Sequence, residues 1–174
     1  MEYTFTLKYQ LADADRDPDA LVERLGEAGC TDALVGIGQP GRLALEFTRA
    51  ASDAGTAVRS ALADVRRAVP AARLIEAAPD LVGLTDVADI VGVSRQNMRK
   101  LMLAHPGSFP PPIHEGSASI WHLADVLAWL QARGGYPLDK DVLEVADVAL
   151  QVNVAKEGRR ARPAASRELE TLLG

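Results

Sequence analysis

A short run of basic and amide side chains near the middle of the chain has the composition of a surface that reads DNA. The run consists of Arg95, Gln96, Asn97, Arg99 and Lys100. Arginine can donate two hydrogen bonds to guanine, asparagine or glutamine can pair similarly with adenine, and lysine neutralises phosphate. The alternative is a solvated helix face, which is the usual fate of such a cluster. We favour DNA binding because of the elements that flank the run.

Two short helices joined by a glycine turn are expected to position these side chains. Thr85 is expected to cap the first helix, and Gly92 can adopt the left-handed conformation that ends it. Ser94 is expected to cap the second helix, with Val93 and Met98 placed as a hydrophobic staple across its start. The apolar positions at helical spacing are Val87, Ile90 and Val91 in the first helix, and Met98, Leu101 and Met102 in the second. Together the two segments form a helix-turn-helix.

A short hairpin and a third helix are predicted after this pair. The Phe109–Pro112 segment leads into two short strands, and Gly116-Ser117 between them suits a two-residue type II′ turn. The third helix ends at Gly134-Gly135. Its apolar stripe contains Leu123, Val126, Leu127 and Leu130. Helix-turn-helix, hairpin and closing helix together make a winged helix.

The stretch from about Gly83 to Leu130 resembles the DNA-binding domain of MerR-like regulators and phage excisionases. The matching features are Leu-Thr-x-x-Ala-x-x-Val-Gly-Val-Ser-Arg, a Phe-Pro before the wing, and Trp…Asp-Val-x-x-Trp-Leu after it. The resemblance covers under a third of the chain and implies sequence-specific DNA binding, with the second helix in the major groove. One departure is that the wing carries His114 and Glu115 where basic residues would help to grip phosphate. The expected DNA contacts are Thr85, Ser94, Arg95, Gln96, Asn97, Arg99, Lys100, His114 and Ser117.

Residues 1–79 precede this unit and show the element order β-α-β-β-α-β, which predicts a ferredoxin-like domain. Alternating apolar residues from Tyr3 to Leu11 indicate a half-buried strand, and Asp17 with Pro18 marks the start of a helix. Ser52 is expected to cap the second helix. The glycines of residues 36–41 match G-x-G-x-x-G, but a strand follows them instead of a helix, so we interpret them as a hairpin turn and not a dinucleotide site.

Residues 136–174 form a predicted C-terminal helical tail. The helix from Asp139 to about Lys156 has apolar residues on more than one side, which fits either a dimer interface or docking onto the chain's own winged helix, residues 83–134. Arg159–Pro163 is a basic linker broken by proline. Leu169, Leu172 and Leu173 then form a short apolar segment able to bind a partner.

The composition limits the classes of protein that fit. Of the 174 residues, 48% are hydrophobic, which is enough to bury a proper core, and no apolar run approaches the ~20 residues that span a bilayer. Met1-Glu2-Tyr3 leads directly into a strand pattern, so we expect no signal peptide. Cys30 is the lone cysteine, which argues against disulfides and cysteine metal clusters and fits a reducing cytoplasm. Fifteen arginines beside four lysines suggest a bacterial source.

Catalytic chemistry is not expected. His105, His114 and His122 are scattered without the spacing of metal ligands, and His122 is expected to cap the third helix. The aspartates between residues 13 and 19 lack the glycine and glutamate of a calcium loop. We therefore expect no enzyme activity, no metal and no cofactor.

The net charge of −5 affects how DNA could be bound. Residues 81–134 carry four basic and four acidic side chains, which makes this the least acidic part of the chain without making it basic. Such a domain should make few phosphate contacts per protomer, so we expect a homodimer. The sequence thus favours an α+β protein that binds double-stranded DNA as a bacterial transcriptional regulator. The alternative is an antitoxin or phage-derived adaptor whose C-terminal helix binds a protein partner.

Overall fold

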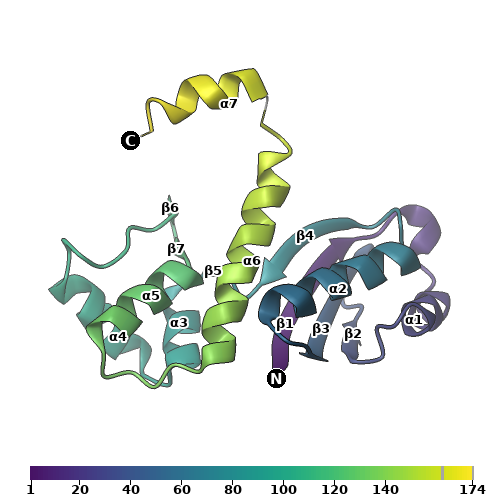
Figure 1. Cartoon of the computed structure of the whole chain (residues 1–174), viewed down its shortest axis with the longest axis horizontal. Coiled ribbons are helices and arrows are strands. Elements are labelled where there is room, and N and C mark those ends of the chain that lie inside the picture. Colours follow the sequence, from purple (N-terminus) through teal and green to yellow (C-terminus); the bar gives the residue numbers. More distant parts are fainter. Residues whose placement is uncertain (162, 174) are drawn as a thin grey trace.

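The computed structural model of the chain describes residues 1–161 and 163–173, which form two packed units bridged by one long helix (Figure 1). The first unit consists of β1 (Glu2–Gln10), α1 (Pro18–Glu27), β2 (Ala33–Gly36), β3 (Arg42–Ala50), α2 (Ala54–Ala68) and β4 (Arg73–Ala78), with a 3-10 turn at Asp13–Asp15. The second consists of β5 (Leu81–Val82), α3 (Leu84–Val91), α4 (Arg95–Ala104), β6 (His114–Glu115), β7 (Ser119–His122) and α5 (Leu123–Arg133). They are followed by α6 (Lys140–Gly158) and α7 (Pro163–Glu170). The predicted α+β class is confirmed, and both sheets are antiparallel.

The first sheet has the strand order β2-β3-β1-β4. Strand β1 alternates as predicted, and its buried side chains Tyr3, Phe5, Leu7 and Tyr9 face the helices. Phe5 lies opposite Phe47 of β3, with ring centroids 5.3 Å apart. The other side of the sheet presents polar residues such as Glu46 and Thr48 to solvent. One polar and one packed face is the ordinary state of an antiparallel sheet.

The helix caps of this unit agree with the sequence at one helix and differ at the other. At α1, the Asp17 carboxylate accepts hydrogen bonds from the backbone N–H groups of Asp19 and Ala20, as expected of an N-cap before Pro18. At α2, the prediction of Ser52 is wrong. The N-cap is Asp53, whose carboxylate accepts from the Thr56 N–H at 2.7 Å, while the Ser52 hydroxyl donates to that same carboxylate. The carboxylate of Asp53 therefore caps the helix in place of the Ser52 hydroxyl.

The glycine-rich segment of residues 36–41 forms the connection between β2 and β3, as predicted, and no helix begins there. Gly41 has φ of 75°, a left-handed conformation that glycine adopts without strain.

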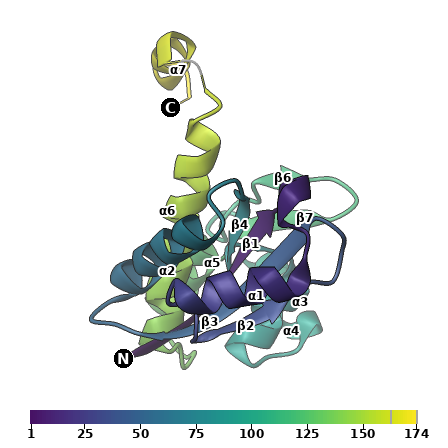
Figure 2. The same ribbon diagram turned by 90° about the vertical axis from the view of Figure 1, so that its right-hand side faces the viewer.

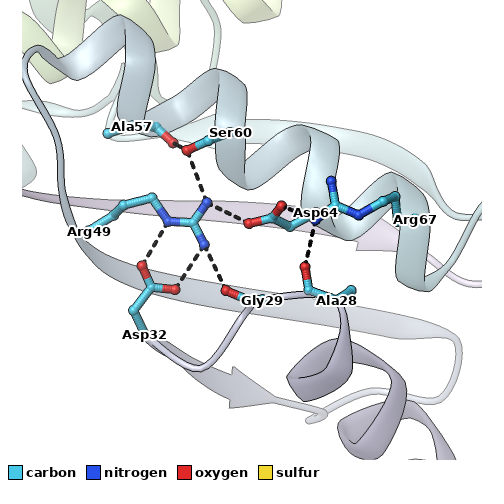
Figure 3. A network of polar contacts seen from close by, with 8 residues as sticks. All are labelled: Ala28, Gly29, Asp32, Arg49, Ala57, Ser60, Asp64 and Arg67. Atoms are coloured by element: carbon cyan, nitrogen blue, oxygen red, sulfur yellow. Dashed lines mark hydrogen bonds and ion pairs between the residues drawn. The ribbon is translucent and has the colours of Figure 1, made fainter.

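A buried arginine fixes the end of β3 against α2 (Figure 3). The Arg49 guanidinium donates two hydrogen bonds to Asp32, at 2.7 and 2.9 Å, and others to Asp64 and Ser60. The hydrogen bonds from Arg49 lower the pKa of Asp32 below its ordinary value, and those carboxylates raise the pKa of Arg49. The network joins the loop before β2, strand β3 and helix α2, so its role is structural.

Helix α6 lies between the two units and belongs to the core of each. Val145 and Ala149 pack in the core of the first unit, while Ala146 packs in the core of the second. Of the two alternatives for its broad apolar surface, docking onto the chain's own units is what the structure contains, and α6 contacts both of them. Its Lys156 ammonium also donates to the Ile75 carbonyl of β4. None of the described helices is long and apolar enough to cross a membrane.

A buried polar cluster lies where the units meet. The Asn153 side chain of α6 accepts from the Ala77 N–H at 2.9 Å and donates to the Ala77 carbonyl at 2.8 Å, as a strand partner would. The same amide donates to the carboxylate of Asp80 at 2.8 Å. On its other side, Asp80 faces Nδ1 of His122 at 2.7 Å. His122 does occupy the N-cap position of α5, but its ring forms no cap hydrogen bond because it is turned toward Asp80.

Replacement of Asn153 should therefore destabilise the protein far more than replacement of an exposed amide on the same helix. Asn153→Ala leaves the buried Ala77 N–H and carbonyl without partners, at a cost of about 2–4 kcal/mol in the free energy of unfolding. The control is Gln151→Ala, since Gln151 is exposed and bonds only to Asp147; it should change stability by less than about 0.5 kcal/mol. Chemical denaturation of both variants is the measurement. Equal losses would contradict the structural role of Asn153.

Candidate nucleic-acid interface

The turn between α3 and α4 is built from local signals in the sequence. Gly92 has φ 76° and ψ 33°, and its N–H donates to the Asp89 carbonyl. The Val93 N–H donates to the Ala88 carbonyl at 2.9 Å. This pair of hydrogen bonds with a left-handed glycine is a Schellman motif, so the predicted end of the first helix is confirmed.

The start of α3 differs from the prediction. The N-cap is Gly83, and Thr85 is an exposed residue in the first helical turn. The Gly83 N–H donates to the Asp86 carboxylate at 2.8 Å. Because Asp86 accepts this hydrogen bond from Gly83, the helix begins at Leu84, and Thr85 lies inside its first turn instead of at the cap.

The start of α4 matches the prediction. The Ser94 hydroxyl accepts a hydrogen bond from the Asn97 N–H at 3.1 Å. Met98 is 1% exposed and lies in the core of the second unit, and Val93 packs against that core, in the arrangement of a hydrophobic staple. Leu101 and Met102 pack there as well. One side of α4 is thereby fixed, which leaves the opposite side free to contact a ligand.

The exposed side of α4 carries the five predicted side chains Arg95, Gln96, Asn97, Arg99 and Lys100. Within the described part of the chain, the three cations of this set form no ion pair, and α4 contains no acidic residue. Guanidinium, amide and ammonium donors thus lie on consecutive turns with their hydrogen-bonding capacity available. The adjacent α3 contributes the exposed carboxylates of Asp86 and Asp89, which weaken attraction to phosphate on that flank.

A cation that the sequence did not single out lies beside α4. A shallow groove of about 410 Å³ is lined by Asn97, Lys100 and Leu101 of α4 and by Arg133 and Tyr136 beyond it. Arg133 ends α5 and also lies over the Trp129 ring, with its guanidinium carbon 5.6 Å from the centroid. Arg133 extends the basic edge of α4. In the sequence, Arg133 is distinguished only as a basic residue immediately before Gly134-Gly135.

Aromatic packing positions the segment between α4 and the hairpin. Phe109 contacts Trp121 and Trp129 edge to face, with centroids 6.2 and 5.1 Å away. The Trp121 indole N–H donates to the Pro110 carbonyl at 3.0 Å. These contacts account for the Phe-Pro and Trp features in the sequence. Strand β7 also pairs with β5, which completes a three-stranded sheet in the order β5-β7-β6.

The hairpin turn differs from the expected two-residue type II′ turn. Glu115 pairs with Ser119, so three residues form the loop, and Gly116 does not have positive φ. A Cβ on Gly116 would lie 2.6 Å from Nε2 of His114, so the ring of His114 occupies the space of a side chain.

The predicted site residues fall into two groups. Ser94 and the five side chains of α4 are contiguous, and Thr85 is exposed on the neighbouring α3. His114 and Ser117 are exposed on the hairpin. Both views place β6 at the upper end of this unit and α4 at its lower end, with α5 or α3 between them (Figures 1 and 2). The structure therefore gathers the α4 residues and does not bring the hairpin residues next to them.

A metal-binding cluster is not found among residues 1–161 and 163–173. In this part of the chain, no three His, Cys, Asp or Glu side chains are arranged to hold a metal ion. Burial raises the pKa of the Cys30 thiol to about 11, so the thiolate that would be a nucleophile or a metal ligand is disfavoured.

Comparison of the chain with protein-family models, with curated proteins and with solved structures finds no match.

Substitution of Gly92 tests the turn that orients α4. Nothing lies within 4 Å of a Cβ at Gly92, so Gly92→Ala introduces only the strain of a left-handed alanine, about 1–2 kcal/mol. The control is Gly107→Ala, where a Cβ is also unobstructed and φ is not positive. It should stay within about 0.5 kcal/mol of the wild type in chemical denaturation. A Gly92→Ala variant as stable as Gly107→Ala would show that the turn adopts another conformation.

Proposed function

We propose that this protein binds double-stranded DNA sequence-specifically through the exposed face of α4, and that it acts as a transcriptional regulator. The observation that carries the proposal is the separation of α4 into two sides. Met98 anchors one side in a core, and the other presents Arg95, Gln96, Asn97, Arg99 and Lys100 without an acidic residue on the helix. A helix of this width fits the major groove, where such side chains can discriminate all four base pairs.

The surrounding elements support this proposal. The second unit contains, in chain order, two helices joined by a Schellman turn, a hairpin and a closing helix. This is the order of a winged helix-turn-helix, the arrangement that the resemblance to MerR-like regulators and excisionases implies. The order β-α-β-β-α-β and the strand order β2-β3-β1-β4 support a ferredoxin-like arrangement of the first unit. The hairpin that carries His114 and Ser117 contributes less than α4, because its strand β6 lies at the other end of the unit in Figures 1 and 2.

A dimer follows from the charge of the DNA-binding unit. Residues 81–134 contain only four basic side chains, Arg95, Arg99, Lys100 and Arg133, balanced by four acidic ones. So few cations supply a small electrostatic affinity. In a dimer, each protomer would read one half-site, with the two half-sites one DNA helical turn or a multiple of a turn apart. This arrangement doubles both the phosphate contacts and the base contacts.

The proposal is tested with a binding site selected from a random DNA pool. Arg95→Ala and Arg99→Ala should each lose about 1–3 kcal/mol of binding free energy on that site and relax base preference at one position. Lys100→Ala should weaken binding to all sequences alike and reduce the salt dependence of the affinity. The control is Arg59→Ala, which removes an exposed arginine from α2 of the other unit and should bind as the wild type does. Folded variants of all three α4 residues with unchanged binding would overturn the assignment.

A further inference from the structure

A groove of about 990 Å³ lies in the first unit, on the opposite flank of α6 from α4. It is bounded by the C-terminal end of α2, the start of β4 and the C-terminal end of α6. Apolar side chains contribute to its lining, including Leu62 and Val65 of α2 and Leu74 of β4. Leu62 and Leu74 are only partly buried, so this apolar surface remains accessible.

Basic side chains surround the apolar part of the groove. They are Arg66, Arg73, Lys156, Arg159 and Arg160, and Glu157 is the one carboxylate in the lining. Lys156 and Arg160 both pair with Glu157. Arg66, Arg73 and Arg159 form no ion pair with any residue that the structure describes. The groove thus combines an accessible apolar surface with unpaired positive charge on several of its walls.

The C-terminal segment has the complementary pattern. Leu169, Leu172 and Leu173 are 54%, 77% and 79% exposed. The Leu172 N–H donates to the Leu169 carbonyl at 2.8 Å, so the helical turn continues past the end of α7. If the helix is extended to Leu173, the spacing i, i+3 and i+4 places the three leucines on one face. Glu168 and Glu170 flank Leu169 at about 100° on either side of that face.

We propose that the segment Pro163–Leu173 of a second copy of this chain occupies the groove, and that the exchange is reciprocal. The leucines would cover the accessible parts of Leu62 and Leu74, while Glu168 and Glu170 would face Arg66 and Arg73. In Figure 1, α7 runs from the end of α6 toward the side of the second unit, away from α2 and β4, which line the groove; this favours a second copy as the occupant. A reciprocal exchange buries both grooves and both leucine faces in one two-fold dimer.

This dimer extends the proposed function by naming the contact between protomers, but its test uses no DNA, so the two can fail separately. Light scattering over a concentration series measures the dimer of the full chain. Glu168→Arg with Glu170→Arg, and separately Arg66→Glu with Arg73→Glu, each place like charges across both interfaces. Each double variant should weaken dimerisation by on the order of a hundredfold. The matched control, Glu23→Arg with Glu27→Arg on the exposed side of α1, should dimerise as the wild type does.

Mixing the two double variants is the decisive step. In the mixed dimer, the reversed tail meets the reversed groove, and the unchanged tail meets the unchanged groove, so both interfaces regain opposite charges. The mixture should therefore form a dimer while each variant alone stays a monomer with an intact fold by circular dichroism. A monomeric wild type would overturn the proposal and leave the leucines to a different protein partner. Failure of the mixture to dimerise would also overturn it, as would a reversed variant that dimerises as tightly as the wild type.

Discussion

One buried carboxylate connects the first unit, the second unit and α6. None of the Asp80 side chain is exposed, and it is hydrogen-bonded to Asn153 of α6 and to His122 before α5. A carboxylate so buried is costly unless it is hydrogen-bonded, and here each of its two oxygens has a partner. The Asp80 backbone carbonyl also accepts from the Leu123 N–H at 2.7 Å. The end of β4, the start of α5 and the C-terminal half of α6 are therefore fixed at a single point.

The position of α4 follows from that point through packed side chains. Leu123 begins α5 and belongs to the same core as Leu127 and Leu130, and this core also contains Met98 of α4. Ala146 of α6 closes the core from the side of the first unit, while its neighbour Val145 packs on the first sheet. The groove that we propose for a second copy is built on α6 as well. A dimer formed there would therefore set the spacing of the two α4 helices through one rigid helix in each protomer.

Local signals in the sequence predicted the elements and the turn at the site. Alternation predicted β1, Asp17 with Pro18 predicted the start of α1, and Gly92 with Ser94 predicted the α3–α4 turn, because each depends on residues within one helical turn. The caps at Ser52 and Thr85 were wrong, since a nearby aspartate at position 53 or 86 bonded the helix start instead. Choosing between adjacent cap candidates requires geometry that the sequence does not contain.

Contacts between distant residues could not be predicted in this way. Asp80 and Asn153 are 73 residues apart, and Arg49 is 17 residues from Asp32, with no periodic pattern to connect them. The distance between the hairpin and α4 likewise depends on the packing of α5 and not on any motif. The polar face of α4 was predicted because all five of its side chains belong to one helix. Arg133 was missed because it lies beside α4 but belongs to α5.

Site-directed DNA cleavage tests most directly whether α4 enters the major groove. A cysteine introduced by Gln96→Cys can carry an iron chelate that cuts nearby DNA, and the native Cys30 is 4% exposed with a thiol pKa raised to about 11, so labelling is confined to α4. The matched control carries the same group at Glu23→Cys on α1. We expect strong cuts from position 96 within each half-site of a selected DNA, and none from position 23. Absence of cuts from position 96 on DNA that remains bound, or an equal pattern from both positions, would contradict α4 as the DNA-reading helix.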